Sequence, residues 1–229
     1  MARQPRFDLA GIPQHVVQRG NNRLPCFLDD HDRHCYLHLL HEALPDTRCA
    51  LHAYVLMDNH VHLLVTPPMA GAIPRLMQKL GRQYVGQFNA RHRRTGTLWE
   101  GRYKACLVDS ESYMLRCYRY IDLNPVRARM TDDPAGYPWS SCATHCGDRD
   151  DSLLTPHPAY TALGRTVHER GAAYQALLRE TLADGELDGI RDYLQQQRAL
   201  GHDDFRAWVE AKTRRFAGIR PAHRPPRNH

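Results

Sequence analysis

The clearest pattern of apolar and polar positions lies in HAYVLMDNHVHLLVTP, residues 52–67. Two short apolar runs flank the pair Asp58-Asn59, which is typical of a β-hairpin turn. Because alternate side chains of a strand share one face, His60 and His62 point the same way. The pattern therefore predicts a hairpin that presents two imidazoles side by side.

The other patterns before residue 125 switch between strand-like and helix-like periods. They predict, in chain order, a strand at residues 14–19, a helix at 29–44 with an aspartate cap, the hairpin at 48–66, a helix at 73–93, a strand at 98–108 and a helix at 111–124. Pro125 should end the last helix, because proline disfavours helix in the residue before it. This order predicts an α+β fold: a ferredoxin-like antiparallel sheet (βαββαβα) with helices on one face, plus a C-terminal helical extension.

The composition of the chain changes after residue 130. Residues 131–165 are rich in proline, serine, threonine and glycine, and are predicted to wrap around the principal domain, residues 1–130, as an ordered loop. Residues 166–229 are predicted to be a basic helical extension, with helices near 168–183, 186–199 and 203–216. The last two helices, joined around Gly201, allow a helix-turn-helix.

The overall composition is that of a globular protein, with 42% hydrophobic and 24% charged residues among 229. No apolar run approaches the ~20 residues of a membrane span, and the basic N-terminus lacks the apolar core of a signal peptide. The seven cysteines do not have the spacing of a disulfide scaffold. We therefore expect a cytoplasmic protein with no membrane partner.

Basic residues outnumber acidic ones, with 31 Lys and Arg against 25 Asp and Glu and a net charge of +6. Nearly all of the basic residues are arginine, whose guanidinium matches the geometry of phosphate. This favours a nucleic acid as partner, and hence a nucleoid-associated protein. Arg19, Arg23, Arg102 and Lys104 are the predicted phosphate or base contacts.

Other side chains of metal-binding types lie outside the hairpin. They are the series His31, His34, His38 and His41, the group Cys142, His145 and Cys146, and the single His15. The series is better explained as a solvated or half-buried helix face, and the cysteine group lacks the second ligand pair of a zinc site. His15 is either a pocket residue or a structural one, and the structural role is favoured. The chain contains no HExxH motif and no phosphate-binding loop motif.

The predicted helix at residues 111–124 supplies a candidate nucleophile. Tyr120 and Asn124 are four residues apart and share a helix face, whereas Tyr118 lies roughly 200° round the helix and is expected to be packed. A phenol, with a pKa of about 10, is a poor nucleophile without a nearby cation. Two imidazoles, an amide and a tyrosine suit attack on a phosphate beside a metal ion.

Three motifs together resemble a known family. YVLMDNHVHLLVTP, GTLWEGRYKACLVDSESY and RYIDLNPVRA, in this order, resemble the single-tyrosine transposases with a His-hydrophobic-His (HUH) motif. More narrowly, they resemble the transposases associated with repetitive extragenic palindromes (REP elements). The segments GIPQHVVQRGNNR and YPWSS are also similar, so the resemblance spans roughly residues 5–147.

This resemblance implies that residues 1–130 are a catalytic domain that nicks and transfers single-stranded DNA. His60 and His62 would be ligands of Mg²⁺ or Mn²⁺, and Tyr120 would be the nucleophile. Asn124 stands where the wider group commonly has glutamine as third ligand. Cleavage of a strand folded as a hairpin, a REP-like palindrome, would leave a 5′-phosphotyrosine and a free 3′-hydroxyl. Both a monomer and a homodimer are compatible with the resemblance.

Two other interpretations stay open at the level of sequence. A non-catalytic DNA- or RNA-binding protein could combine a ferredoxin-like scaffold with a helix-turn-helix-like tail. That interpretation gives no reason for the combination of His60, His62 and Tyr120. A host protein that keeps the chemistry without mobilising itself would have the same sequence features as an active transposase.

Overall fold

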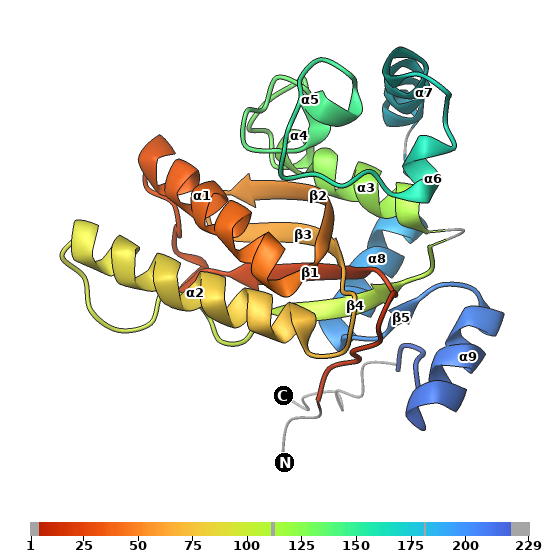
Figure 1. Cartoon of the computed structure of the whole chain (residues 1–229), viewed down its shortest axis with the longest axis horizontal. Helices are drawn as coiled ribbons and strands as arrows, with labels where there is room; N and C mark the ends of the chain where they lie inside the picture. Colours follow the sequence, from red (N-terminus) through yellow and green to blue (C-terminus); the bar gives the residue numbers. More distant parts are fainter. Residues whose placement is uncertain (1–4, 111–112, 181, 221–229) are drawn as a thin grey trace, which may run out of the picture.

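A computed structural model describes residues 5–110, 113–180 and 182–220 of the chain. At its centre is a five-stranded sheet with the strand order β2-β3-β1-β4-β5 (Figure 1). The strands are β1 (Gln14–Arg19), β2 (Ala50–Met57), β3 (His60–Thr66), β4 (Lys104–Val108) and β5 (Ala199–Leu200). The first four strands pair antiparallel and β5 pairs parallel with β4, which makes the sheet mixed.

The helices and strands alternate in the predicted βαββαβα order. The helices are η1 (Asn21–Arg23, a 3-10 turn), α1 (Asp30–Thr47), α2 (Ala72–Arg91), α3 (Met114–Asp122), α4 (Asn124–Arg127), α5 (Cys142–His145), α6 (Pro158–Thr161), α7 (Val167–Arg179), α8 (Asp184–Gln196) and α9 (Asp203–Thr213). The predicted cap of α1 is confirmed, because the Asp29 side chain accepts a hydrogen bond from the Asp32 backbone N–H at 3.1 Å. Among the described helices, none combines the length and apolar character of a membrane span.

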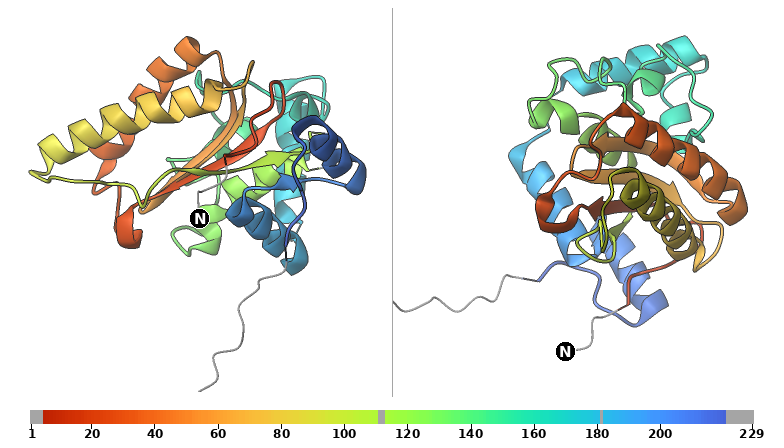
Figure 2. Two further views of the ribbon diagram at one scale, coloured as in Figure 1. Left: turned by 90° about the horizontal axis from the view of Figure 1, so that it is seen from below. Right: turned by 90° about the vertical axis from the view of Figure 1, so that its left-hand side faces the viewer.

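Helices cover both faces of the sheet (Figure 2). The prediction of helices on one face is confirmed for α1 and α2, which pack against Val61, Leu63 and Val65 of β3. The alternation along β3 places His60 and His62 on the opposite face. There the sheet packs against α3 and α8, so Tyr120 of α3 and the two histidines lie on the same side of the sheet.

Two predicted boundaries in the principal domain are wrong. The fourth strand begins at Lys104, and only a single bridge between Gly20 and Trp99 precedes it. Pro125 does not end helical structure: α3 ends at Asp122, and Pro125 lies in the first turn of α4. A proline in a first turn loses no helix hydrogen bond, because that N–H has no partner within the helix in any case.

The predicted helix-turn-helix is also corrected. The second helix of the extension ends at Gln196, and the next residues form β5, which lengthens the sheet beside β4. A strand therefore separates α8 from α9. The arrangement anchors the extension to the sheet and does not form a simple helix-turn-helix.

The outer edge of β2 is covered by residues that follow α4. The Leu56 N–H donates to the Trp139 carbonyl at 2.9 Å, and the Thr155 N–H donates to the Leu51 carbonyl at 2.7 Å. These bonds satisfy backbone groups that an open sheet edge leaves unpaired.

A buried carboxylate joins α3 to the segments that follow it. Asp122 is fully buried and accepts hydrogen bonds from Ser141 Oγ at 2.9 Å, His145 Nδ1 at 2.7 Å and Tyr174 Oη at 2.7 Å. A buried carboxylate is tolerated only when it is paired in this way. The network therefore fixes the end of α3 relative to α5 and α7.

Asp122→Asn is expected to lower the free energy of unfolding by about 2–4 kcal/mol. The amide keeps the size of the carboxylate but adds donors where three donors already meet. Urea denaturation followed by circular dichroism measures the loss. The matched control is Asp46→Asn, an exposed carboxylate paired with Lys79, for which a loss of at most about 1 kcal/mol is expected. Equal losses in the two variants would contradict the structural role of Asp122.

Candidate active site

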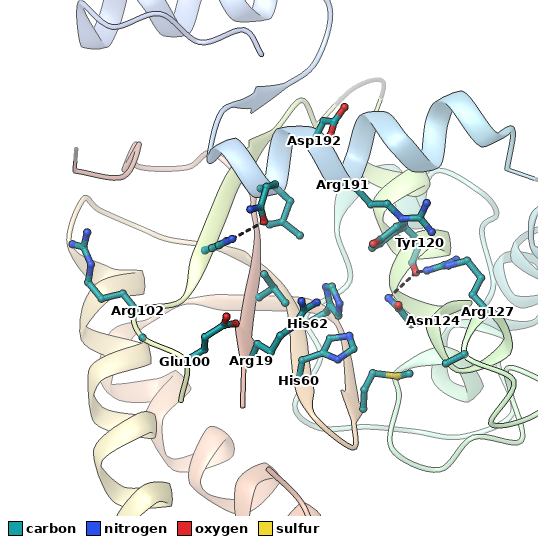
Figure 3. A pocket seen from close by; sticks show the side chains of 17 residues that line it. Arg19, His60, His62, Glu100, Arg102, Tyr120, Asn124, Arg127, Arg191 and Asp192 are labelled. Atoms are coloured by element: carbon teal, nitrogen blue, oxygen red, sulfur yellow. Dashed lines mark hydrogen bonds between the residues drawn. The ribbon is translucent and has the colours of Figure 1, made fainter. Parts of the chain in front are cut away.

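A cavity of about 700 Å³ opens on the histidine-bearing face of the sheet (Figure 3). Its walls come from β1, β2, β3, the segment before β4, β4 itself, α3, α4 and α8. Seven of the eight site residues expected from the sequence line it: Arg19, His60, His62, Arg102, Lys104, Tyr120 and Asn124. The eighth, Arg23, is exposed at the end of η1 and does not line the cavity.

His60 and His62 lie at the floor of the cavity, with ring centroids 4.9 Å apart. His60 Nδ1 bonds the amide oxygen of Asn59 at 2.6 Å. Because that oxygen can only accept, Nδ1 carries the proton and Nε2 keeps its lone pair. The turn residue Asn59 thus fixes the tautomer of His60 that can bind a metal through Nε2.

His15 holds the second imidazole. His15 Nε2 lies 2.7 Å from His62 Nδ1, and the centroids of the two rings are 5.0 Å apart. His15 is completely buried, and burial lowers its pKa to about 3, so it is neutral and its Nε2 can accept a hydrogen bond from the His62 Nδ1–H. In that arrangement His62 Nε2 keeps its lone pair. His15 is therefore a buried residue that supports His62 and does not line the cavity, in agreement with the structural role that the sequence favours.

The two candidate ligands are neutral near pH 7. Burial, with a contribution from Arg19, lowers the pKa of His60 to about 4. Burial and the neighbouring His60 and His15 also place the pKa of His62 well below its usual value. Neutral imidazole is the form that binds metal ions.

Tyr120 stands directly over the histidines. Its ring meets His62 edge-on at 5.9 Å between centroids, and it meets His15 at 5.6 Å. The Arg127 guanidinium lies 4.5 Å from the centre of the Tyr120 ring and also donates to the Tyr120 backbone carbonyl. Tyr118 is fully buried, and its hydroxyl accepts from the His157 N–H at 3.4 Å. Tyr118 is therefore packed away from the cavity, as expected.

Asn124 reaches the cavity from the start of α4. Its Nδ2 donates to the Tyr120 carbonyl at 3.1 Å, which leaves Oδ1 as the atom available to a ligand. With the Nε2 atoms of His60 and His62, Oδ1 completes a neutral donor set of two nitrogens and one oxygen. Such a set suits a divalent ion that also needs oxygen atoms from phosphate and water. The residues present therefore fit Mg²⁺ or Mn²⁺.

The other groups of metal-binding residue types do not form sites. All four members of the helical histidine series are exposed on α1 (His31, His34, His38 and His41). His145 instead bonds Asp122. Within the part of the chain that the structure describes, no three His, Cys, Asp or Glu side chains are placed to hold one metal ion. A metal site at His60 and His62 would therefore need the amide of Asn124 as its third donor.

Residues 9–124 match the family described as "Transposase IS200 like". The chain belongs to the IS200-like transposase family. This confirms the resemblance to transposases that the three motifs indicate. The matched region contains His60, His62, Tyr120 and Asn124, and it ends before α7, α8 and α9.

Solved structures add a likeness of fold to the family assignment. A REP-associated tyrosine transposase bound to a REP hairpin aligns at 16% sequence identity and a TM-score of 0.52, covering 68% of this transposase and 98% of that chain. A putative transposase from Deinococcus radiodurans R1 aligns at 18% identity and a TM-score of 0.35, covering 57% of this chain and 91% of that one. The second score is too low for a structural argument. No curated protein matches the chain.

Two arginines at the site escape the sequence reasoning. Arg127 lies seven residues after Tyr120, about two helical turns, so its spacing is a usable signal. Burial lowers the pKa of its guanidinium to about 10. Arg191 comes from α8, and no pattern in the extension indicates that this helix docks beside Tyr120. Another α8 residue, Gln195, accepts a hydrogen bond from Lys104 Nζ at 2.5 Å.

Arg102→Ala is expected to weaken binding of single-stranded DNA and to make the slope of log affinity against log salt less negative by about 0.7, the value for one lost phosphate contact. Fluorescence anisotropy with a labelled oligonucleotide over a salt series measures both quantities. The control is Arg82→Ala, which removes an exposed arginine from α2 on the other face of the sheet. An unchanged slope for Arg102→Ala would remove this residue from the DNA contacts.

Proposed function

We propose that this transposase is a metal-dependent nickase and strand transferase of hairpin-bearing, REP-like single-stranded DNA, with Tyr120 as its single nucleophile. The observation that carries the proposal is the meeting of Tyr120 with His60 and His62 in one cavity. The family assignment supports DNA processing. The fold shared with a transposase that binds a REP hairpin supports the choice of substrate.

The chemistry divides between the sheet and the helix. His60, His62 and Asn124 would hold Mg²⁺ or Mn²⁺, and the ion would supply positive charge for the oxygens of the scissile phosphate. The Tyr120 hydroxyl loses its proton to water, and its oxygen attacks phosphorus and forms the new P–O bond while the bond to the 3′ oxygen breaks. The 3′ oxygen leaves with the electron pair and takes up a proton. The products are a 5′-phosphotyrosine and a free 3′-hydroxyl.

Basic side chains hold the strand in this account. Arg19, Arg102 and Lys104 line the cavity and would contact phosphates on the way to the nucleophile. Arg23, exposed next to this wall, would contact the DNA outside the cavity. The affinity would therefore depend strongly on salt.

Tyr120→Phe is expected to abolish cleavage of a hairpin-bearing oligonucleotide in Mn²⁺, with a loss of at least about 10³-fold because no other oxygen replaces the nucleophile. DNA affinity should stay within about threefold. A denaturing gel follows the product, and a gel with the protein left intact follows the covalent adduct. Tyr118→Phe, the matched control two residues away, should cleave at nearly the parent rate. If Tyr120→Phe cuts as well as the parent, the nucleophile is assigned wrongly.

His15→Phe is expected to lower the affinity for Mn²⁺ by about 10–100-fold, because His62 loses the acceptor that fixes its tautomer. His15→Gln retains an acceptor oxygen and should lose less. Isothermal titration calorimetry with Mn²⁺ measures both variants without DNA, and circular dichroism confirms that they fold. Parent-like affinity in His15→Phe would exclude the tautomer-fixing role.

A further inference from the structure

One wall of the active-site cavity comes from outside the region that matches the family. Helix α8 contributes Arg191, Asp192, Leu194 and Gln195 to the cavity (Figure 3). The family match ends at residue 124, so these residues belong to the C-terminal extension of this chain. The extension is therefore part of the site and not a separate appendage.

Helix α8 is held firmly beside the nucleophile helix. Ile190 and Leu194 are buried in the same apolar core as Tyr120. An ion pair of 3.2 Å joins Arg116 of α3 to Glu186 in the first turn of α8. After α8, strand β5 pairs with β4 and fixes the other end. A side chain of α8 that points into the cavity thus has a defined position relative to Tyr120.

Arg191 is that side chain. It lies next to Tyr120 in the cavity (Figure 3), while Asp188 accepts a hydrogen bond from its Nη1 at 2.9 Å. Burial lowers the pKa of Arg191, but the hydrogen bond to Asp188 favours the charged form, and the pKa is raised overall. About half of the Arg191 side chain is exposed, so its guanidinium can also reach a ligand in the cavity.

Two arginines therefore flank Tyr120 in different ways. Arg127 lies against the ring and is tied to the Tyr120 backbone, which makes it a packing partner. Arg191 comes from α8 and lies next to the Tyr120 side chain in the cavity, where its guanidinium is partly exposed. A guanidinium at this point offers several N–H donors in one plane, enough to bind the attacking oxygen and a phosphate oxygen together.

We propose that Arg191 is a catalytic residue supplied by the extension, binding the Tyr120 oxygen and a non-bridging oxygen of the scissile phosphate. This proposal rests on the proposed function. As the Tyr120 oxygen bonds to phosphorus and the 3′ oxygen departs with its electron pair and takes up a proton, negative charge grows on the non-bridging oxygens. Arg191 stabilises that charge opposite the histidine side of the cavity and forms no covalent bond itself. A single chain then contains every residue of the site.

Single-turnover cleavage of a hairpin oligonucleotide, taken from a palindrome flanking the gene, tests the role. In Mn²⁺, Arg191→Ala should cleave about 10²–10³-fold more slowly than the parent, and Arg191→Lys should recover part of the rate. Arg179→Ala removes an exposed arginine of α7 that does not line the cavity and should cleave at the parent rate. Parent-like cleavage by Arg191→Ala would overturn the proposal.

A binding experiment tests the same contact without cleavage. Methylphosphonate, which is uncharged, replaces each linkage near the hairpin in turn, and affinity is measured in the Tyr120→Phe background. We expect one linkage at which methylphosphonate weakens binding at least tenfold relative to the unmodified strand. When Arg191→Ala is added, the modified and unmodified strands should bind with equal affinity. The absence of such a linkage would overturn the role of Arg191. If the parent protein does not cleave the oligonucleotide but the Arg191-dependent loss of affinity is observed, the proposed function alone is overturned.

Discussion

The contact between α3 and the histidine-bearing face of the sheet is the constraint on which the site depends. Strand alternation directs His60 and His62 to that face, and the apolar side of α3 packs there and carries Tyr120 with it. The buried Asp122 network then prevents α3 from shifting, because any shift would leave a carboxylate unpaired in the core. Residues far apart in sequence thereby meet within one cavity.

Much of this arrangement follows from local patterns. The residues of β1, the hairpin turn and the cap of α1 are predicted because period, turn chemistry and capping are local properties. His60, His62 and Tyr120 are predicted because their motifs combine residue types that serve one chemistry. The role of His15 depends on the pairing of β1 with β3, which sets Val17 opposite His62 and so brings His15 to the same face. That pairing is a tertiary feature, so the contact of His15 with His62 could not be predicted from the sequence, although the structural role of His15 could be.

The parts that could not be predicted are those set by docking between distant segments. The charged, amphipathic sequence of α8 does not predict the surface against which this helix packs. Arg191 and Gln195 therefore cannot be assigned to the cavity from the sequence. The strand β5 has only two residues, too few to show the alternation of apolar and polar residues that predicts a strand. The sequence therefore predicts these residues as the end of a helix. Pro125 misleads for a different reason: the same residue type is disfavoured inside a helix and favoured in its first turn.

The proposed chemistry requires that His60 and His62 hold a metal ion beside Tyr120. Crystals grown with Mn²⁺, with diffraction data collected at an energy where manganese scatters anomalously, test this directly. The account predicts one strong anomalous peak between the Nε2 atoms of His60 and His62, on the side that faces Asn124 and Tyr120. No peak at saturating Mn²⁺, or a peak only elsewhere in the chain, would contradict it.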